Sequence, residues 1–250
     1  MIKKKVIGLI PARLGSKRVK CKNLRLINGR PLISYCIEKV KKVRCFDEVC
    51  VNSESALIGK VAERYGIEWY SRPDALALST SMIDEYIYEF LCHRECDVLA
   101  VINPTSPFLT VGDMEKAVDQ FLNSDCQTQL CCEAVQTHCF LNGRAINFNT
   151  NGQHPRSQDL APVLALNFAI TIWDAKALMR QYEEKGHGVY TGKLGFYKME
   201  GFANVDIDYE DDFALARVIM ENYAAIRADS KTEYDPVLDQ VIADGFNTEK

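Results

Sequence analysis

The stretch VIGLIPARLGSKRVKCKN, residues 6–23, determines how the whole chain is interpreted. Its first five residues are one glycine and four aliphatic side chains, three of them β-branched, and Pro11 ends the run. This pattern predicts a buried strand. Five cations then follow within ten residues: Arg13, Lys17, Arg18, Lys20 and Lys22. A flexible, strongly cationic turn directly after a first strand is suited to binding a polyphosphate.

The basic loop, residues 12–23, has two interpretations. In the first, Gly15 lets backbone N–H groups converge on phosphate oxygens while the cations neutralise the phosphate charge. In the second, the loop is a solvated basic segment, as charge runs usually are. The phosphate interpretation is favoured because the loop lies at the carboxyl end of a first parallel strand, where ligands of open α/β sheets bind.

Composition limits the class of partner. Hydrophobic residues make up 47% of the chain and charged residues 26%, as in soluble globular proteins. The formal net charge of −4 argues against nucleic acid as a partner, and the concentration of cations in the basic loop favours a small anionic ligand. No apolar run approaches the length of a membrane span, so no membrane partner is expected.

All ten cysteines lie at or before Cys139. Only five residues separate Lys5 from Pro11, too few for the apolar region of a secretory signal, so a cytoplasmic protein with reduced, mostly buried thiols is expected. A zinc site at Cys92–Cys96 or Cys131–Cys132 is the alternative. Only the first of these clusters contains a histidine and no CxxC occurs, so structural burial is favoured.

Strand and helix patterns alternate along the chain. After the first strand, strands are predicted at 46–51, 67–70, 97–102, 129–135, 163–173, 195–199 and 204–208. Helices are predicted at 32–43, 56–65, 82–92, 111–122, 175–184 and 210–223, with Thr80 or Ser81 as the N-cap of the third and Thr110 as that of the fourth. We therefore predict an α/β fold, a Rossmann-like three-layer sandwich with a mostly parallel sheet and 97–102 as its central strand.

Helical periodicity is lost between Thr137 and Pro162. Asn142–Gly143 and Asn151–Gly152 favour hairpins there over helices. We interpret this segment as an insertion on the α/β body rather than as a separate domain. Residues 1–228 are thus expected to form a single domain, followed by a polar tail at 229–250.

Asp206 and Asp208 form the second informative feature. Side chains two apart on a strand point to the same face, so both carboxylates are expected to project together. Mg²⁺ typically takes one or two carboxylates and leaves its other positions to water and substrate phosphates. The alternative is a solvated strand end with a capping aspartate. Alone the pair decides nothing, but beside the basic loop it favours Mg²⁺-dependent nucleotidyl transfer.

Two common nucleotide-binding motifs are absent from the sequence. No GxGxxG follows the first strand, which argues against a dinucleotide-dependent dehydrogenase. No GxxxxGK[ST] occurs, which argues against a P-loop nucleotide hydrolase.

A series of motifs resembles the acylneuraminate cytidylyltransferase family, the CMP-sialic acid synthetases. In order, between about Val6 and Tyr223, they are IPARLGSKRVKCKNL, GRPLISYCIE, FDEVCVNSES, SRPDALA, NPTSPF, PRSQDLAP and VDIDYEDDF. Members of that family couple CTP to a nine- or eight-carbon 2-keto sugar acid and release pyrophosphate. The resemblance implies a fold of the nucleotide-diphospho-sugar transferase type, Mg²⁺ as cofactor, and a CMP-sugar product for cell-surface polysaccharide.

The resemblance also implies roles for individual residues. The nucleotide-binding set is Ala12, Arg13, Gly15, Ser16, Lys17, Lys22, Asn23, Arg72, Thr80 and Ser81, in which Arg72 helps to read the base. Catalytic roles fall to Arg13, Lys22 and Asp208, and metal binding to Asp206 and Asp208. Asn103 belongs to the sugar half of the site in that family. As a separate hypothesis, Arg156 and Gln158 of the insertion hold the sugar carboxylate, and the alternative for Arg156 is an exposed loop residue.

Departures from the family pattern concentrate on the sugar half. Asn103 stands where the family commonly has Gln, Leu109 where it has Arg, and Met82 where the sialic acid enzymes have Ser. The family's Asn-Gly-Ala-Ile-Tyr appears here as residues 167–171, Asn-Phe-Ala-Ile-Thr. Such changes in polar groups shift specificity strongly. N-acetylneuraminate, legionaminate, pseudaminate and an eight-carbon 3-deoxy keto acid all remain open as acceptors.

A reaction and an assembly follow as hypotheses. The anomeric hydroxyl of the acidic sugar attacks the α-phosphorus of CTP in line, and the cations of the basic loop offset phosphate charge. In the resembling family the insertion builds a dimer interface, so residues 137–162 imply a homodimer. Two alternatives stay open: a sugar-1-phosphate nucleotidyltransferase that uses another nucleoside triphosphate, and a non-catalytic nucleotide-binding protein.

Overall fold

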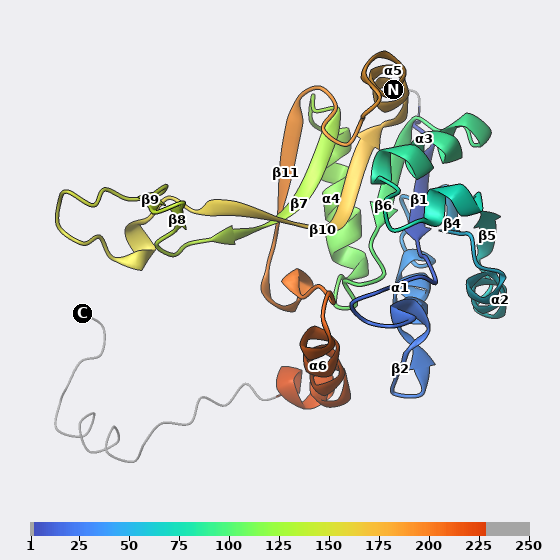
Figure 1. The fold of residues 1–250 in the computed structure, drawn as a ribbon, viewed down its shortest axis with the longest axis horizontal. Helices are drawn as coiled ribbons and strands as arrows, with labels where there is room; N and C mark the ends of the chain where they lie inside the picture. The colour runs from blue at the N-terminus through green and yellow to red at the C-terminus, as the bar shows by residue number, and fades with distance from the viewer. Residues whose placement is uncertain (1–2, 229–250) are drawn as a thin grey trace.

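A computed structural model describes residues 3–228, and its framework is a seven-stranded sheet in the order β11-β7-β10-β6-β1-β4-β5 (Figure 1). The strands are β1 (Val6–Pro11), β4 (Glu48–Ser53), β5 (Glu68–Ser71), β6 (Val98–Ile102), β7 (Thr128–Val135), β10 (Val163–Asp174) and β11 (Leu194–Met199). Only β10 runs antiparallel to its neighbours. The predicted mostly parallel sheet is confirmed, with β6 at its centre. The predicted tail at 229–250 lies outside the described residues.

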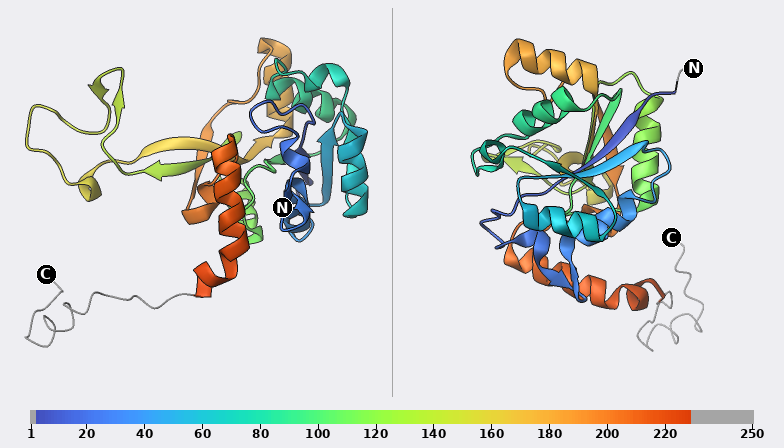
Figure 2. Two further views of the ribbon diagram at one scale, coloured as in Figure 1. Left: turned by 60° about the horizontal axis from the view of Figure 1, so that its bottom comes forward. Right: turned by 90° about the vertical axis from the view of Figure 1, so that its right-hand side faces the viewer.

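Helices cover both faces of the sheet, which confirms the predicted three layers (Figure 2). They are α1 (Leu32–Val40), α2 (Ala56–Arg64), α3 (Ile83–His93), α4 (Val111–Leu122), α5 (Ala175–Lys185) and α6 (Glu210–Ala228). Helices α1, α2 and α4 pack with Ile10 on one face, and α3 and α5 pack with Leu9 on the other. The alternation along β1 therefore buries both of its faces, and each such side chain contributes roughly 1.5–3 kcal/mol.

A third apolar cluster fastens α6 to the start of the chain. Phe213 and Ile219 of α6 pack against Val19 of the basic loop and Ile27 of a small hairpin formed by β2 (Leu26–Ile27) and β3 (Arg30–Pro31). Ile207, fully buried, belongs to the same cluster. This packing brings residues 206–208 next to the basic loop, although the two segments lie near opposite ends of the sequence.

The segment 137–162, which we call the arm, projects away from the body (Figure 1). It contains the hairpin of β8 (Phe140–Leu141) and β9 (Arg144–Ala145) and the short helix η3 (Ser157–Asp159). Asn142 and Gly143 both have positive φ, +49° and +77°. That is the conformation of the tightest hairpin turns and the reason for the Asn-Gly preference. The predicted hairpin is therefore confirmed at Asn142–Gly143. At Asn151–Gly152 the prediction is wrong, because that pair lies in a turn with no strands directly on either side.

The predicted strand at 204–208 is wrong. A short helix, η4 (Gly201–Asn204), is followed by irregular backbone through Asp208. The N–H of Ile207 donates to the carbonyl of Thr105 at 3.0 Å. Because Ile207 is also buried against α6, this segment crosses the turn after β6 instead of pairing with a strand.

The predicted caps of two helices have different outcomes. Thr110 caps α4, accepting from Asp113 N–H at 3.1 Å as predicted. Helix α3 is preceded by Met82, whose N–H donates to the Glu85 carboxylate at 2.9 Å. The prediction of Thr80 or Ser81 as that cap is wrong, because the Ser81 hydroxyl donates instead to the carbonyl of Ala75.

Five of the ten cysteines are buried, and Cys92 is exposed. Burial raises the pKa of Cys36, Cys50 and Cys96 to about 12, so these thiols stay protonated at neutral pH. Across residues 3–228, none of the helices is both long and apolar enough to cross a bilayer.

Candidate active site

The basic loop borders two adjacent cavities at the carboxyl ends of β1 and β6. The larger cavity measures about 310 Å³ and the smaller about 200 Å³. Pro11, Arg13 and Asn103 line both. Arg13 therefore stands at the boundary between the two, and its Nη1 donates to the carbonyl of Leu78 at 3.1 Å. This is the edge of the sheet at which the sequence predicted a ligand.

The smaller cavity is strongly charged. Its lining includes Ser16, Lys17, Arg18, Lys22, Asn103, Thr105 and Asp208. Arg18 Nη2 lies 2.7 Å from Asp208 Oδ1, and Lys22 Nζ lies 3.6 Å from the same oxygen. Cations of the basic loop thus face a carboxylate from the other end of the chain. A polyphosphate bound in this cavity would lie next to the positively charged side chains of Lys17, Arg18 and Lys22.

Asp206 and Asp208 precede and follow the buried residue Ile207, and of the two only Asp208 lines the smaller cavity. The hydroxyl of Thr105 donates to the Asp206 carboxylate, and Lys22 Nζ donates to the carbonyl of Ile207. Burial raises the pKa of Asp206, and the nearby Asp208 adds to this. Burial also lowers the pKa of Lys22, against the opposing influence of both carboxylates. The two aspartates therefore share one electrostatic site even though no strand aligns them.

The aspartate pair fits a magnesium ion by its donor set. Asp208 borders the cavity with 41% of its side chain exposed, and Asp206 stands beside it. Hard oxygen ligands of this kind suit Mg²⁺, which takes few protein ligands and completes its shell with water and phosphate. Within residues 3–228 no group of three or more His, Cys, Asp or Glu is placed to hold a metal. Any bound Mg²⁺ would therefore depend on the substrate for further ligands.

The larger cavity is suited to a flat polar group. Arg72, only 5% exposed, reaches its wall with the guanidinium 4.7 Å from the centre of the Tyr86 ring. Its Nε is buried and has no hydrogen-bond partner in the described structure. A bulge in β10 places Phe168, with φ +52°, on the same lining. Bulges commonly re-aim a side chain next to a site.

The nucleotide-binding residues predicted from the sequence are only partly brought together. Ala12, Arg13, Ser16, Lys17, Lys22, Asn23, Arg72 and Ser81 line one or both cavities. Thr80 is exposed and lines neither cavity. Gly15 is also exposed, and a Cβ there would meet nothing within 4 Å, so no contact in the structure requires glycine.

Of the three predicted sugar-binding residues, one lies at the cavities and two lie on the arm. Asn103 lies between the two cavities. Arg156 and Gln158 lie on the arm, and neither lines either of these two cavities. Arg156 instead pairs with Asp159 at 2.7 Å. Their role in binding sugar stays a prediction, and one that requires the arm to reach another chain.

Residues of the site that were not assigned from the sequence include Arg18, Glu54, Tyr86 and Thr105. Glu54 and Thr105 follow β4 and β6, so their place at the carboxyl edge of the sheet was a usable signal. Tyr86 sits within α3, where nothing in a helical pattern distinguishes it from a core residue.

Comparison with known structures first shows the fold. The fold is similar to that of CMP:2-keto-3-deoxy-manno-octonic acid synthetase complexed with CTP, with a TM-score of 0.67 at 17% identity over 88% of this chain and 99% of that one. A sequence profile of the cytidylyltransferase family matches residues 7–235. The chain therefore belongs to the cytidylyltransferase family, which confirms the family resemblance inferred from its motifs.

Individual relatives agree with this membership. The CMP-N,N'-diacetyllegionaminic acid synthase of Legionella pneumophila is 28% identical over 87% of this chain and 97% of its own length. The N-acylneuraminate cytidylyltransferase of Escherichia coli is 36% identical over 42% of this chain, a match that spans 25% of that protein. Several other curated relatives are matched over about half of their length.

Proposed function

We propose that this protein transfers the cytidylyl group of CTP to an acidic 2-keto sugar, a nonulosonate or a related acid, giving a CMP-sugar and pyrophosphate. Membership of the cytidylyltransferase family supports the donor. The names of the Legionella and Escherichia relatives support the acceptor class. The observation that carries the proposal is the smaller cavity, where basic-loop cations face Asp208 beside a second cavity of about 310 Å³.

The triphosphate would occupy the smaller cavity. Arg13, Lys17 and Lys22 offset its charge and hold it for in-line attack by the anomeric hydroxyl, so that pyrophosphate leaves opposite the attacking oxygen. Asp206 and Asp208 would hold Mg²⁺, which when bound stabilises phosphate charge and lowers the pKa of a coordinated hydroxyl. Lys22, whose pKa burial lowers, still lies beside two carboxylates that favour its charged form.

The nucleoside would occupy the larger cavity. The Arg72 guanidinium lies at the wall of this cavity, and cytosine carries acceptors at its O2 and N3 that a guanidinium can satisfy. Tyr86 stacks beneath the Arg72 guanidinium and fixes its plane. The base would then lie on the α3 side of the site, with its phosphates directed past Arg13.

The acceptor side would be completed by a second copy of the chain. The arm exposes three large apolar side chains, Phe140 (57%), Leu141 (63%) and Ile146 (50%), on an element that projects from the body. Several large exposed apolar side chains on one projecting element are typical of an interface. We propose a homodimer in which Arg156 and Gln158 of one arm approach the sugar carboxylate bound beside Asn103 of the other chain.

The proposed activity also suggests where the protein works. CTP is an intracellular metabolite, and the ten cysteines are free thiols in the described structure, so we propose a cytoplasmic enzyme. Its CMP-sugar product would supply cell-surface polysaccharide. This assignment rests on the class of reaction and on the family to which the chain belongs.

An acceptor panel tests the proposal. The protein is incubated with Mg²⁺, CTP and each of four acids in turn: N-acetylneuraminate, legionaminate, pseudaminate and an eight-carbon 3-deoxy keto acid. We expect pyrophosphate release with at least one acid and a CMP-sugar mass in that reaction. Parallel reactions contain GTP or UTP, or sugar 1-phosphates as acceptors. Turnover only with those would overturn the proposal, and CTP binding without product from any acceptor would favour a non-catalytic role.

A further inference from the structure

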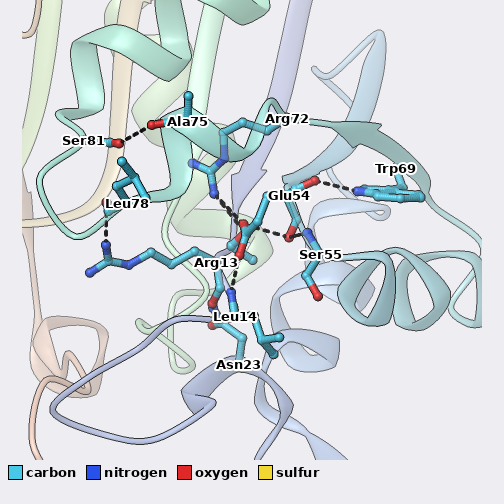
Figure 3. A network of polar contacts seen from close by, with 12 residues as sticks. Arg13, Leu14, Asn23, Glu54, Ser55, Trp69, Arg72, Ala75, Leu78 and Ser81 are labelled. Atoms are coloured by element: carbon cyan, nitrogen blue, oxygen red, sulfur yellow. Dashed lines mark hydrogen bonds and ion pairs between the residues drawn. The ribbon is translucent and has the colours of Figure 1, made fainter.

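Glu54 occupies a position that no part of the reaction described above uses. It follows directly after β4, and its carboxylate lies between the basic loop and Arg72 (Figure 3). Only 15% of the Glu54 side chain is exposed, and only 4% of that of Arg72. A carboxylate this buried needs hydrogen bonds or a charged partner, and Glu54 has both.

Each carboxylate oxygen of Glu54 holds a different part of the site. Oε1 accepts the backbone N–H of Leu14 at 2.8 Å, and Oε2 accepts Arg72 Nη2 at 3.4 Å. The same Nη2 donates to the carbonyl of Ala12 at 3.1 Å. Ala12 and Leu14 are the two neighbours of Arg13. The backbone on both sides of Arg13 is therefore held by one ion pair, that of Glu54 with Arg72. Figure 3 shows the contacts of these two side chains beside the backbone of Arg13.

The ion pair also matters for Arg72 itself. Burial lowers the pKa of this guanidinium, while Tyr86 and Glu54 act in the opposite direction. Among residues 3–228, Glu54 is the only carboxylate that forms an ion pair with Arg72. Removing its charge would leave a buried cation uncompensated, which favours movement of the side chain toward water.

We propose that Glu54 is a positioning residue that couples the two halves of the nucleotide site. It holds Arg13, between the cavities, and Arg72, at the wall of the larger one, in a single fixed arrangement. This inference rests on the proposed function, because it takes the occupant of both cavities to be one nucleoside triphosphate. Glu54 lines neither cavity, so its proposed effect on the nucleotide is exerted through the residues that it holds.

The test compares three variants with the wild type, all as full-length protein. Glu54→Gln keeps the shape and an acceptor for Leu14 N–H but removes the charge, and Glu54→Ala removes both contacts. Glu63→Gln is the matched control, since Glu63 is an exposed residue of α2 without a side-chain contact in the described structure. The measurements are the CTP dissociation constant, the KM of the sugar, the preference for CTP over UTP, and the thermal midpoint without ligand.

We expect Glu54→Gln to weaken CTP binding by at least about tenfold, Glu54→Ala by more, and Glu63→Gln to match the wild type. The KM of the sugar should stay constant, and the preference for CTP over UTP should fall because Arg72 is released. A lower thermal midpoint with unchanged CTP affinity in the folded protein would mean a purely structural role and would overturn the inference. A wild type that binds no CTP would overturn the proposed function and this inference together.

Discussion

The basic loop and the arm are both connections between strands, yet they are held in opposite ways. The basic loop is tied to distant parts of the chain: Leu14 to Glu54, and Arg18 to Asp208. In the arm the polar contacts are local, as between Arg156 and Asp159. A loop anchored by the body is formed before any ligand arrives.

The local contacts of the arm have a different consequence. Asn147 Nδ2 donates to the carbonyl of Thr137, and the rings of His138 and His154 stack with centres 4.2 Å apart. Such contacts let the arm keep its own shape while it extends from the body. A self-supporting element with an exposed apolar surface is suited to packing on another chain, whereas the basic loop is suited to a charged small molecule.

The largest effect is expected at the basic loop, which is the segment anchored to the body. Asp208→Asn keeps the shape of the side chain but removes the charge that faces Arg18 and Lys22. Turnover with Mg²⁺ should fall by at least about a hundredfold, because charge stabilisation in such sites is worth that much. The fold should persist, since the Asp208 side chain is 41% exposed. Steady-state rates with circular dichroism provide the measurement.

Asp211→Asn is the control for this prediction. Asp211 lies three residues further along, in the first turn of α6, and is exposed. The same loss of one carboxylate there should leave turnover unchanged. Near-normal turnover in Asp208→Asn would remove the proposed metal role of this residue.

A smaller but distinct effect is expected in the arm. Phe140→Asp places a charge within the exposed apolar surface, where Phe140 is 57% exposed. The dimer should dissociate to monomers at micromolar concentration, because a buried unpaired carboxylate costs several kcal/mol. CTP affinity should not change, since the basic loop makes its contacts within the body. Light scattering after size-exclusion chromatography gives the mass, and titration gives the affinity.

Leu57→Asp provides the matched control, because Leu57 is 54% exposed on α2. This variant should keep the mass of the wild type. A wild type that is already monomeric at high concentration, or a Phe140→Asp protein that remains dimeric, would contradict the role given to the arm.

The contrast between local and distant contacts also explains what the sequence could predict. Signals carried by neighbouring residues gave correct elements: Pro11 ends β1, Thr110 and Asp113 cap α4, and Asn142–Gly143 forms the hairpin turn. A mostly parallel sheet with 97–102 as its central strand followed as well, because strands and helices alternate along the chain. These features depend on the immediate surroundings of each residue.

The wrong and missing predictions concern features that depend on contacts between residues far apart in the sequence. The backbone at 204–208 is set by Thr105 and by the cluster under α6, so its own alternating pattern misled the prediction of a strand. Glu54 was missed because its importance comes from Leu14 and Arg72, which lie far from it along the chain. The direction in which the arm projects depends on the long pairing of β7 with β10, which no local pattern records.

The smallest effect is expected at Arg156, a residue of the arm that is proposed to act at the active site of the other chain. Arg156 is 72% exposed, and its pair with Asp159 is a surface interaction between residues three apart, worth at most about 0.5 kcal/mol of stability. Arg156→Ala should therefore leave the thermal midpoint and the KM of CTP unchanged. If the arm of one chain reaches the sugar bound to the other, the KM of the sugar should rise roughly tenfold or more, because a hydrogen bond to a charged group is worth about 1.5–3 kcal/mol. Arg144→Ala, an exposed arginine on the same arm, controls for a general loss of positive charge. Equal sugar KM values in both variants and the wild type would confine the arm to assembly, and the acceptor site would then have to be built by one chain alone.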